Sequence, residues 1–177
     1  MEGYAFAAAT GAAEALEPQT LAEARRGPDW HHWERAIHEE LENLRSNDTW
    51  DLVEAPNGAN VIGSKWVFRI KKDADGKVVR YKARLVAQGY SQVPGVNYFD
   101  TFAPIARLAS IRTVLAFAAS ENLETGQIDI KSAYLNSELT SNEIVFMRQP
   151  PGYSQGKMVC RLKKPLYGLK QSGRCWY

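Results

Sequence analysis

A tight-turn signal, Asp75-Gly76, separates two runs of alternating apolar and polar residues, and it constrains the fold of this chain more than any other feature. Asp-Gly is typical of two-residue hairpin loops because both residues tolerate the backbone angles that such loops need. We therefore predict a β-hairpin within Val61 to Ala87, with Asp75 and Gly76 as its loop.

The register of this hairpin separates two kinds of side chain. If Asp75 and Gly76 form the loop, Ala74 pairs with Lys77, and the other pairs follow by counting outward. Directly opposed residues share a face of the sheet. The apolar pairs are Ile70–Tyr81, Phe68–Ala83 and Trp66–Leu85, and the opposite face pairs Lys71–Arg80, Arg69–Lys82 and Val67–Arg84. Next to the turn the separation is less complete, because Lys72 falls on the apolar side and Asp73 on the basic side.

The basic face of the predicted hairpin needs an anion beside it. Like charges placed directly opposite destabilise a sheet by up to about 1 kcal/mol per pair. Asp73 is the one acid that the register puts on this face. Contact with phosphate explains why the Lys and Arg side chains cluster. The alternative is a merely solvated face, but such a face normally mixes positive and negative side chains. We predict that the hairpin contacts nucleic acid or a nucleotide.

Charge is also segregated along the whole chain. The formal net charge is +2, but residues 1–60 contain twelve acids and four bases. Residues 157–174 contain six bases and no acid. Concentrated positive segments favour a polyanionic partner.

Composition narrows the class of protein. A hydrophobic fraction of 45% and five tryptophans suffice for a core, which a wholly disordered chain lacks. No run approaches the roughly 18 apolar residues of a membrane helix, and the alanine-rich start resembles neither a signal nor a transit peptide. The sequence predicts an intracellular protein that is neither secreted nor membrane-spanning. Its two cysteines, Cys160 and Cys175, are predicted to be reduced thiols, and its three histidines form no metal pattern.

Further patterns predict an α+β fold. Residues 1–28 are expected to be a tail or linker. Trp30, Trp33, Ile37, Leu41 and Leu44 form one helical stripe after a start signal at Pro28 and Asp29. A second helix is predicted from near Ser110, its possible cap, to Glu121. Residues 91–104 are expected to be a loop. Short strands are predicted at Gln127 to Ile130, Ile144 to Met147 and Val159 to Leu162.

One carboxylate stands out among the candidates for chemistry. Asp129 lies between Ile128 and Ile130 at the end of a predicted strand. It is equally a strand-end turn former or a functional group, because a buried unpaired charge is costly. Glu138 and Glu143 are possible additional metal ligands, with solvated loop carboxylates as the favoured interpretation.

Several blocks in a fixed order resemble the reverse transcriptase domain of copia-type (Pseudoviridae) retrotransposon polyproteins. The resemblance covers residues 17–177. The blocks are Thr49-Trp50-Asp51-Leu52-Val53, Ser64-Lys65-Trp66-Val67-Phe68, Tyr81-Lys82-Ala83-Arg84-Leu85-Val86-Ala87-Gln88-Gly89-Tyr90, Thr101-Phe102-Ala103-Pro104, Asp129-Ile130-Lys131-Ser132-Ala133-Tyr134-Leu135-Asn136 and Leu166-Tyr167-Gly168-Leu169-Lys170-Gln171-Ser172. The resemblance implies a partial right-hand polymerase fold over residues 29–177, with its core at about 48–177. The hairpin would belong to the fingers and Asp129 to the start of the palm, with the rest of the palm and the thumb missing.

The resemblance also implies roles for individual residues. Asp129 matches the first palm aspartate, which binds Mg²⁺ in the family, and Ile130 would lend its backbone carbonyl. Tyr134 matches the aromatic residue that disfavours a 2′-hydroxyl. Nucleotide binding falls to Lys71, Lys82, Arg84 and Tyr134, although the sequence leaves open which hairpin cation meets the triphosphate. Contact with the nucleic acid falls to Lys65, Arg69, Arg80, Gly168, Lys170, Gln171 and Ser172.

The implied chemistry is RNA-directed DNA synthesis by two-metal nucleotidyl transfer. The implied partners are an RNA or DNA template-primer, deoxynucleoside triphosphates and the remainder of a polyprotein. The family's Tyr-Val-Asp-Asp-like box is not among these 177 residues, which contain no Asp-Asp pair. We therefore expect a truncated fragment that is inactive alone. The alternatives are a non-catalytic nucleic-acid-binding remnant and an interaction module that uses the hairpin.

Overall fold

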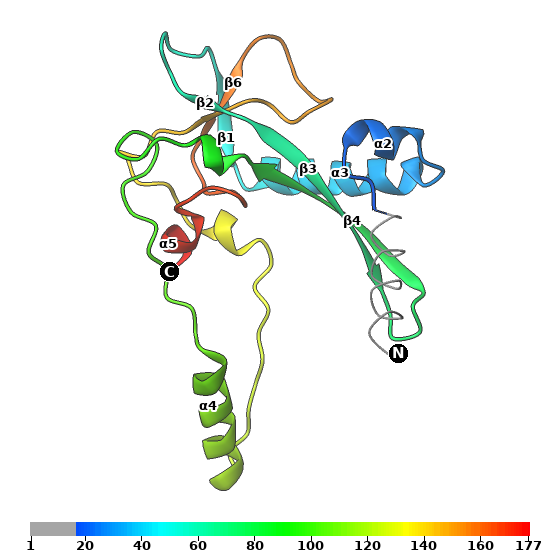
Figure 1. The fold of residues 1–177 in the computed structure, drawn as a ribbon, viewed down its shortest axis with the longest axis vertical. Coiled ribbons are helices and arrows are strands. Elements are labelled where there is room, and N and C mark those ends of the chain that lie inside the picture. The colour runs from blue at the N-terminus through cyan, green and yellow to red at the C-terminus, as the bar shows by residue number, and fades with distance from the viewer. Residues whose placement is uncertain (1–16) are drawn as a thin grey trace, which may run out of the picture.

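The computed structural model describes residues 17–177, which form a mixed α+β fold (Figure 1). The first sixteen residues of the predicted tail lie outside the described range. In chain order the elements are α2 (Leu21–Arg26), α3 (Trp30–Ser46), β1 (Trp50–Val53), β2 (Val61–Ile62), β3 (Ser64–Lys72), β4 (Val78–Ala87), η1 (Gly89–Ser91), α4 (Leu108–Ser120), η2 (Ala133–Asn136), β5 (Phe146–Met147), β6 (Val159–Leu162) and α5 (Ser172–Trp176). The α+β class is thus confirmed.

Strands β3 and β4 form the predicted hairpin, and six of the seven predicted cross-strand pairs are confirmed, the exception being Ala74–Lys77 at the turn. The prediction of a two-residue loop is wrong. The amide of Asp73 donates to the carbonyl of Lys77, which leaves a three-residue loop ending at Gly76, whose φ is +79°. Lys72 then pairs with Val78, and a bulge at Val79, between the pairs Lys72–Val78 and Lys71–Arg80, restores the predicted register. The glycine therefore serves a bulged turn rather than a tight one.

The predicted helix is confirmed as α3, and it covers the apolar face of the hairpin. Trp33 is 2% exposed and packs edge-on against Phe68, with ring centroids 5.1 Å apart. Ile37 and Leu44 continue this buried row toward the second sheet. Burial of each such side chain contributes roughly 1.5–3 kcal/mol, so the contact between helix and hairpin is a main part of the core.

The second sheet has four strands in the order β1-β6-β5-β2. The predicted strand at Val159–Leu162 is confirmed, whereas the one predicted at 144–147 is reduced to Phe146–Met147. Cys160 on β6 is fully buried, and that burial raises the pKa of its thiol to about 12. Both cysteines are free thiols, as predicted.

Part of the predicted tail is helical. Helix α2 begins after Thr20, whose hydroxyl accepts a hydrogen bond from the amide of Glu23. Ala24 is 1% exposed and belongs to the core beside α3. The apolar residues of this short segment show no helical periodicity, so the sequence did not predict the helix. The domain boundary at residue 28 stays a prediction.

The strand predicted at residues 127–130 is wrong, and this stretch is irregular. Ile128 is 88% exposed, so its apolar side chain has no sheet to cover it. The preceding helix is confirmed as α4, although Arg107 rather than Ser110 takes the cap position and its side chain makes no capping hydrogen bond. Helix α4 stands apart from the sheets (Figure 1) and leaves most of its apolar side chains open to solvent. Within residues 17–177, no helix is both long and apolar enough to cross a membrane.

Glu143 joins the C-terminal helix to the second sheet. Its side chain is 1% exposed, and Nη2 of Arg174 donates to both carboxylate oxygens at 2.6 and 2.7 Å. The hydroxyl of Thr140 donates to the same carboxylate at 2.7 Å. Glu143 is therefore a buried structural ion-pair partner, and its interpretation as a solvated loop residue is wrong.

Arg174→Met is expected to lower the free energy of unfolding by about 3–5 kcal/mol, because it leaves the Glu143 carboxylate buried without its cation. Urea denaturation of the purified chain measures this loss. The exposed control Arg161→Met should change stability by less than about 0.5 kcal/mol. Adding Glu143→Leu to Arg174→Met should recover part of the loss, and equal losses in both Arg variants would contradict the assignment.

Candidate functional site

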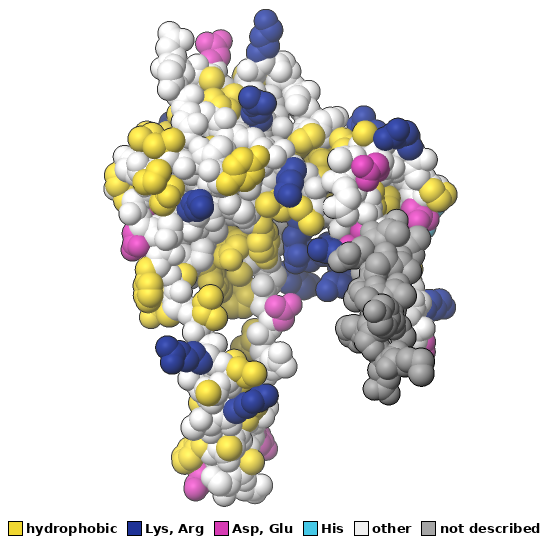
Figure 2. Space-filling view, in the orientation of Figure 1, with side chains coloured by type: hydrophobic (Ala, Val, Ile, Leu, Met, Phe, Trp, Pro, Cys, Tyr) yellow, Lys and Arg dark blue, Asp and Glu magenta, His cyan; other side chains and the backbone are white. Residues whose placement is uncertain are grey.

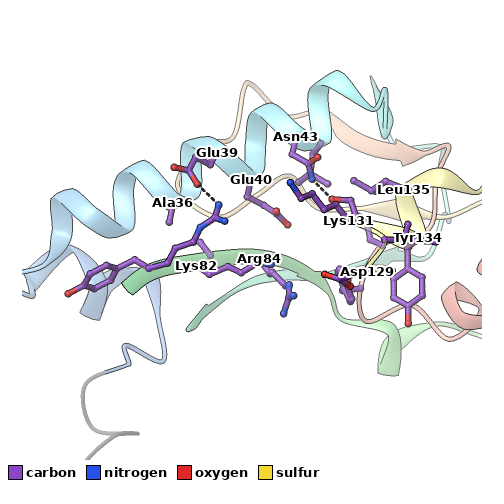
Figure 3. Close-up of a pocket in the computed structure, with 18 of the residues that line it drawn as sticks. Ala36, Glu39, Glu40, Asn43, Lys82, Arg84, Asp129, Lys131, Tyr134 and Leu135 are labelled. Carbon is purple, nitrogen blue, oxygen red and sulfur yellow. Dashed lines mark hydrogen bonds and ion pairs between the residues drawn. The ribbon is translucent and has the colours of Figure 1, made fainter. Parts of the chain in front are cut away.

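A cavity of about 470 Å³ lies between α3, β4, the segment 129–135 and the loop 165–167 (Figure 3). It brings together six of the predicted site residues, namely Arg80, Lys82, Arg84, Asp129, Ile130 and Tyr134. The hairpin places the cations on one side, and the segment after α4 places Asp129 and Tyr134 opposite. Residues separated by some fifty positions in the sequence thus share one cavity.

The cations of the hairpin lie close enough to disfavour one another. Arg69 is directly opposite Lys82, and Lys71 is directly opposite Arg80. The pKa of Lys82 is lowered, first by desolvation and then by the charges of Arg84, Arg80 and Lys71, while Glu40 acts in the opposite direction. An anion placed here would relieve this repulsion. Figure 2 shows Lys and Arg side chains gathered in the hollow beside the hairpin.

Acids from the first third of the chain already neutralise part of this face. Glu39 on α3 accepts a hydrogen bond from Arg80 at 3.0 Å, and Glu17 pairs with Arg69. Glu40 accepts from the backbone amide of Leu85 at 3.2 Å. Sequence reasoning missed these three contacts, although the excess of acids in residues 1–60 was their signal.

Glu40 is the half-buried acid of the cavity. Desolvation raises its pKa, and the hydrogen bond from Leu85 with the charges of Arg84 and Lys82 offsets only part of that effect. Its carboxylate therefore lies beside two cations without a full solvation shell. The negative charge of Glu40 moderates the positive charge that a phosphate would meet.

Tyr167 connects the two sides of the cavity and was also missed. The guanidinium of Arg84 lies over its ring, 5.1 Å from the centroid. The ring of Tyr134 is tilted against it with centroids 4.8 Å apart. Cation–π and aromatic contacts of this kind limit where the guanidinium and the second ring can move.

The segment that carries Asp129 is held by α3. Nδ2 of Asn43 donates to Oγ of Ser132 at 3.1 Å, and Ser132 has a φ of +51°. This left-handed residue turns the chain from the irregular stretch at Asp129 into η2, which carries Tyr134. Asp129 thus reaches the cavity from a loop rather than from a strand.

The donor set around Asp129 does not fit a two-magnesium site. A group of three or more His, Cys, Asp or Glu side chains that could hold a metal ion does not occur anywhere in residues 17–177. Asp129, even with the carbonyl of Ile130, supplies too few oxygen ligands for the predicted Mg²⁺. The described residues therefore do not by themselves supply the ligands of a two-magnesium centre.

The remaining predicted residues lie outside the cavity lining. Lys65 and Lys71 are exposed on β3, and Lys170 is exposed on the loop before α5. Gln171 is fully buried, where its amide donates to the carbonyl of Asn97 and accepts from Gln92. Ser172 is buried too and donates to the carbonyl of Leu166. The side chains of Gln171 and Ser172 therefore support the loop from inside.

Gly168 fits the loop closely against the end of β4. Its φ is +92°, and a Cβ added there would lie 2.1 Å from the carbonyl oxygen of Ala87. The amide of Ala87 in turn donates to the carbonyl of Tyr167 at 2.8 Å. This close approach places Tyr167 beside Arg84.

A family model described as reverse transcriptase (RNA-dependent DNA polymerase) matches residues 47–177. The chain is 46% identical over 164 residues to the retrovirus-related Pol polyprotein from transposon TNT 1-94 of Nicotiana tabacum, covering 91% of this chain and 12% of that protein. It is 40% identical over 176 residues to the corresponding polyprotein from transposon RE2 of Arabidopsis thaliana, covering 97% of this chain and 12% of that protein. The transposon Ty1-DR4 Gag-Pol polyprotein of Saccharomyces cerevisiae is 35% identical over 147 residues, which are 80% of this chain and 9% of that protein. The chain therefore spans 12% or less of these relatives, and no solved structure matches it.

Gly168→Ala is expected to destabilise the chain by about 2–5 kcal/mol, because it adds both left-handed strain and a backbone clash. Gly58→Ala is the matched control. Its φ is +77°, but open space surrounds the added Cβ, so the strain alone should cost about 1–2 kcal/mol. Urea denaturation of both variants measures the difference, and equal losses would show that the close approach to β4 is unimportant.

Proposed function

Because this chain belongs to the reverse transcriptase (RNA-dependent DNA polymerase) family, we propose that its hairpin and adjoining cavity bind a template-primer and a nucleotide. The 177 residues are a segment of the reverse transcriptase domain of copia-type Pol polyproteins. In this proposal the hairpin belongs to the fingers of a right-hand polymerase fold, and Asp129 belongs to the start of the palm.

The excess positive charge of the hairpin carries this proposal. Acids neutralise Arg69 and Arg80, but within the part of the chain that the structure describes no ion pair is formed by Lys65, Lys71, Lys82 or Arg84. The opposite face of the hairpin is buried against α3, so these charged side chains cannot be placed on that face instead. A polyanion such as nucleic acid would neutralise several of them together and release counterions.

The cavity divides the cations into two groups. Lys82 and Arg84 line it together with Tyr134, and we assign these three residues to the nucleotide. Arg80 lines the cavity too, but its guanidinium is paired with Glu39, so we do not assign it to the nucleotide. Lys71, predicted for the nucleotide as well, lies outside the lining. It joins the proposed nucleic-acid path, whose other members are Lys65, Arg69, Arg80, Gly168 and Lys170. Gln171 and Ser172 contribute to this path only by supporting the loop.

Two-metal nucleotidyl transfer needs carboxylate ligands in addition to Asp129, and residues 17–177 contain no group of three or more His, Cys, Asp or Glu side chains that could hold a metal ion. The roles proposed for residues 17–177 are therefore binding and orientation. The guanidinium of Arg84, held over Tyr167, would meet phosphate oxygens, and the ring of Tyr134 would lie beside the sugar. A non-catalytic nucleic-acid-binding function uses the same residues and differs only in lacking synthesis.

The purified chain should bind a fluorescein-labelled RNA–DNA template-primer with an affinity that falls steeply as salt rises from 50 to 200 mM. Lys82→Ala/Arg84→Ala should weaken binding and lower the slope of log K against log salt by up to about 2, because each lost phosphate contact accounts for about 0.9. Fluorescence anisotropy over a salt series measures both quantities.

Arg107→Ala/Arg112→Ala is the matched control, since it removes the same charge from the region of α4, away from the hairpin (Figure 1). Its affinity should stay within about twofold of the unchanged chain, because only non-specific charge is lost. If the two double variants behaved alike, or if salt had no effect, nucleic-acid binding by the hairpin would be refuted.

The same chain should not extend a primer when it is supplied with template-primer, deoxynucleoside triphosphates and Mg²⁺. The reason is the small ligand set at Asp129. A gel-based extension assay with an intact reverse transcriptase as positive control makes the test. Extension that disappears in Asp129→Asn would show that these residues do form a catalytic centre.

A further inference from the structure

Glu17 contacts the hairpin in two ways at once. Its Oε1 accepts a hydrogen bond from the backbone amide of Ile70 at 2.7 Å, and its Oε2 pairs with Nη1 of Arg69. The side chain is 12% exposed, whereas that of Arg69 is 60% exposed. The carboxylate is therefore held in place, while the cation that it neutralises remains within reach of solvent.

The backbone contact has its own physical reason. A two-stranded sheet has two free edges, whose unpaired amide groups need acceptors. Glu17 supplies an acceptor at the edge of β3, and Glu40 supplies one at the edge of β4 through Leu85. Each edge thus receives a carboxylate, and both carboxylates come from the acidic first third of the chain.

We propose that Glu17 is a built-in competitor for phosphate at Arg69. The inference rests on the proposed function, namely that the basic face binds nucleic acid. A phosphate oxygen and a carboxylate oxygen seek the same guanidinium donors. Nucleic acid must therefore either displace Glu17 from Arg69 or bind with one cation fewer. In the free chain the acid lowers the positive potential of the face, which weakens non-specific binding.

The exchange is physically reasonable because the competing pair is weak. Ion pairs in which one partner is well exposed stabilise a protein little, since water screens them. A nucleic acid offers several phosphates together and gains from counterion release. Nucleic acid offers no replacement acceptor to the amide of Ile70. The hydrogen bond from this amide to Glu17 is therefore the contact that would be lost or weakened on binding.

Glu17→Gln tests the proposal, because glutamine keeps an acceptor for Ile70 and removes the charge. It should tighten binding of the RNA–DNA template-primer at 50 mM salt about twofold to fivefold and steepen the salt slope by up to about 1. Arg69→Gln should cancel that gain when the two changes are combined. Glu54→Gln, an equal charge change at an exposed loop position, should leave affinity within about 1.5-fold, since it removes a screened charge.

Hydrogen exchange gives a second measurement that needs no variant. Exchange of the Ile70 amide in the unchanged chain should become faster when saturating template-primer is added, because Glu17 is drawn away. If the chain binds with the expected salt slope but Glu17→Gln matches Glu54→Gln and Ile70 exchange does not change, the competitor role is refuted and nucleic-acid binding stands. If the unchanged chain does not bind at all, the proposed function itself fails.

Discussion

The packing of α3 on the hairpin is the interaction on which the rest of this structure depends. Trp33 and Ile37 bury one face of β3 and β4, and strand alternation then directs every other side chain outward. The outward residues are mostly Lys and Arg, so the apolar contact determines where the positive charge must gather. Repulsion among those cations is a consequence of the core, and the hairpin cannot relieve it by changing its register.

The first third of the chain supplies part of the compensation. Glu17, Glu39 and Glu40 reach the hairpin from α3 or from the segment before α2. Two of these acids also accept edge amides, so they satisfy the backbone and reduce the repulsion at the same time. The charge segregation along the sequence is therefore partly internal, and only the cations left without an acid point to an external anion. Among the described residues, the hairpin cations Lys65, Lys71, Lys82 and Arg84 have no such acid, and the last two line the cavity.

Local patterns predicted this fold well where neighbours in sequence are neighbours in space. The pairs from Trp66–Leu85 to Lys71–Arg80 follow from one turn and strict alternation. The loop length was mispredicted. A three-residue loop followed by a bulge near Val79 gives the same pairs, from Lys71–Arg80 outward, as a two-residue loop without a bulge. The strand predicted at 127–130 is wrong for another reason. A strand needs a neighbouring strand to pair with, and the periodicity of a sequence does not show whether such a neighbour exists. The contacts of Tyr167 and Glu17 were missed because they join segments that are far apart in the sequence.

The candidate site likewise has one part that depends on local sequence and another that depends on contacts between distant segments. Its cationic side is formed by adjacent strands, so the charges of Lys82 and Arg84 are in place whenever the hairpin forms. Its carboxylate side depends on Asp129, whose flanking residue Ile128 is 88% exposed and whose loop is held mainly through Asn43 and Ser132. Binding needs only the first side, because phosphate meets preformed cations. Catalysis needs several carboxylates held at fixed distances, and one loop aspartate cannot meet that demand. In the proposed function, anion binding and nucleotidyl transfer are thus separable, and the described residues supply the groups that the first would use.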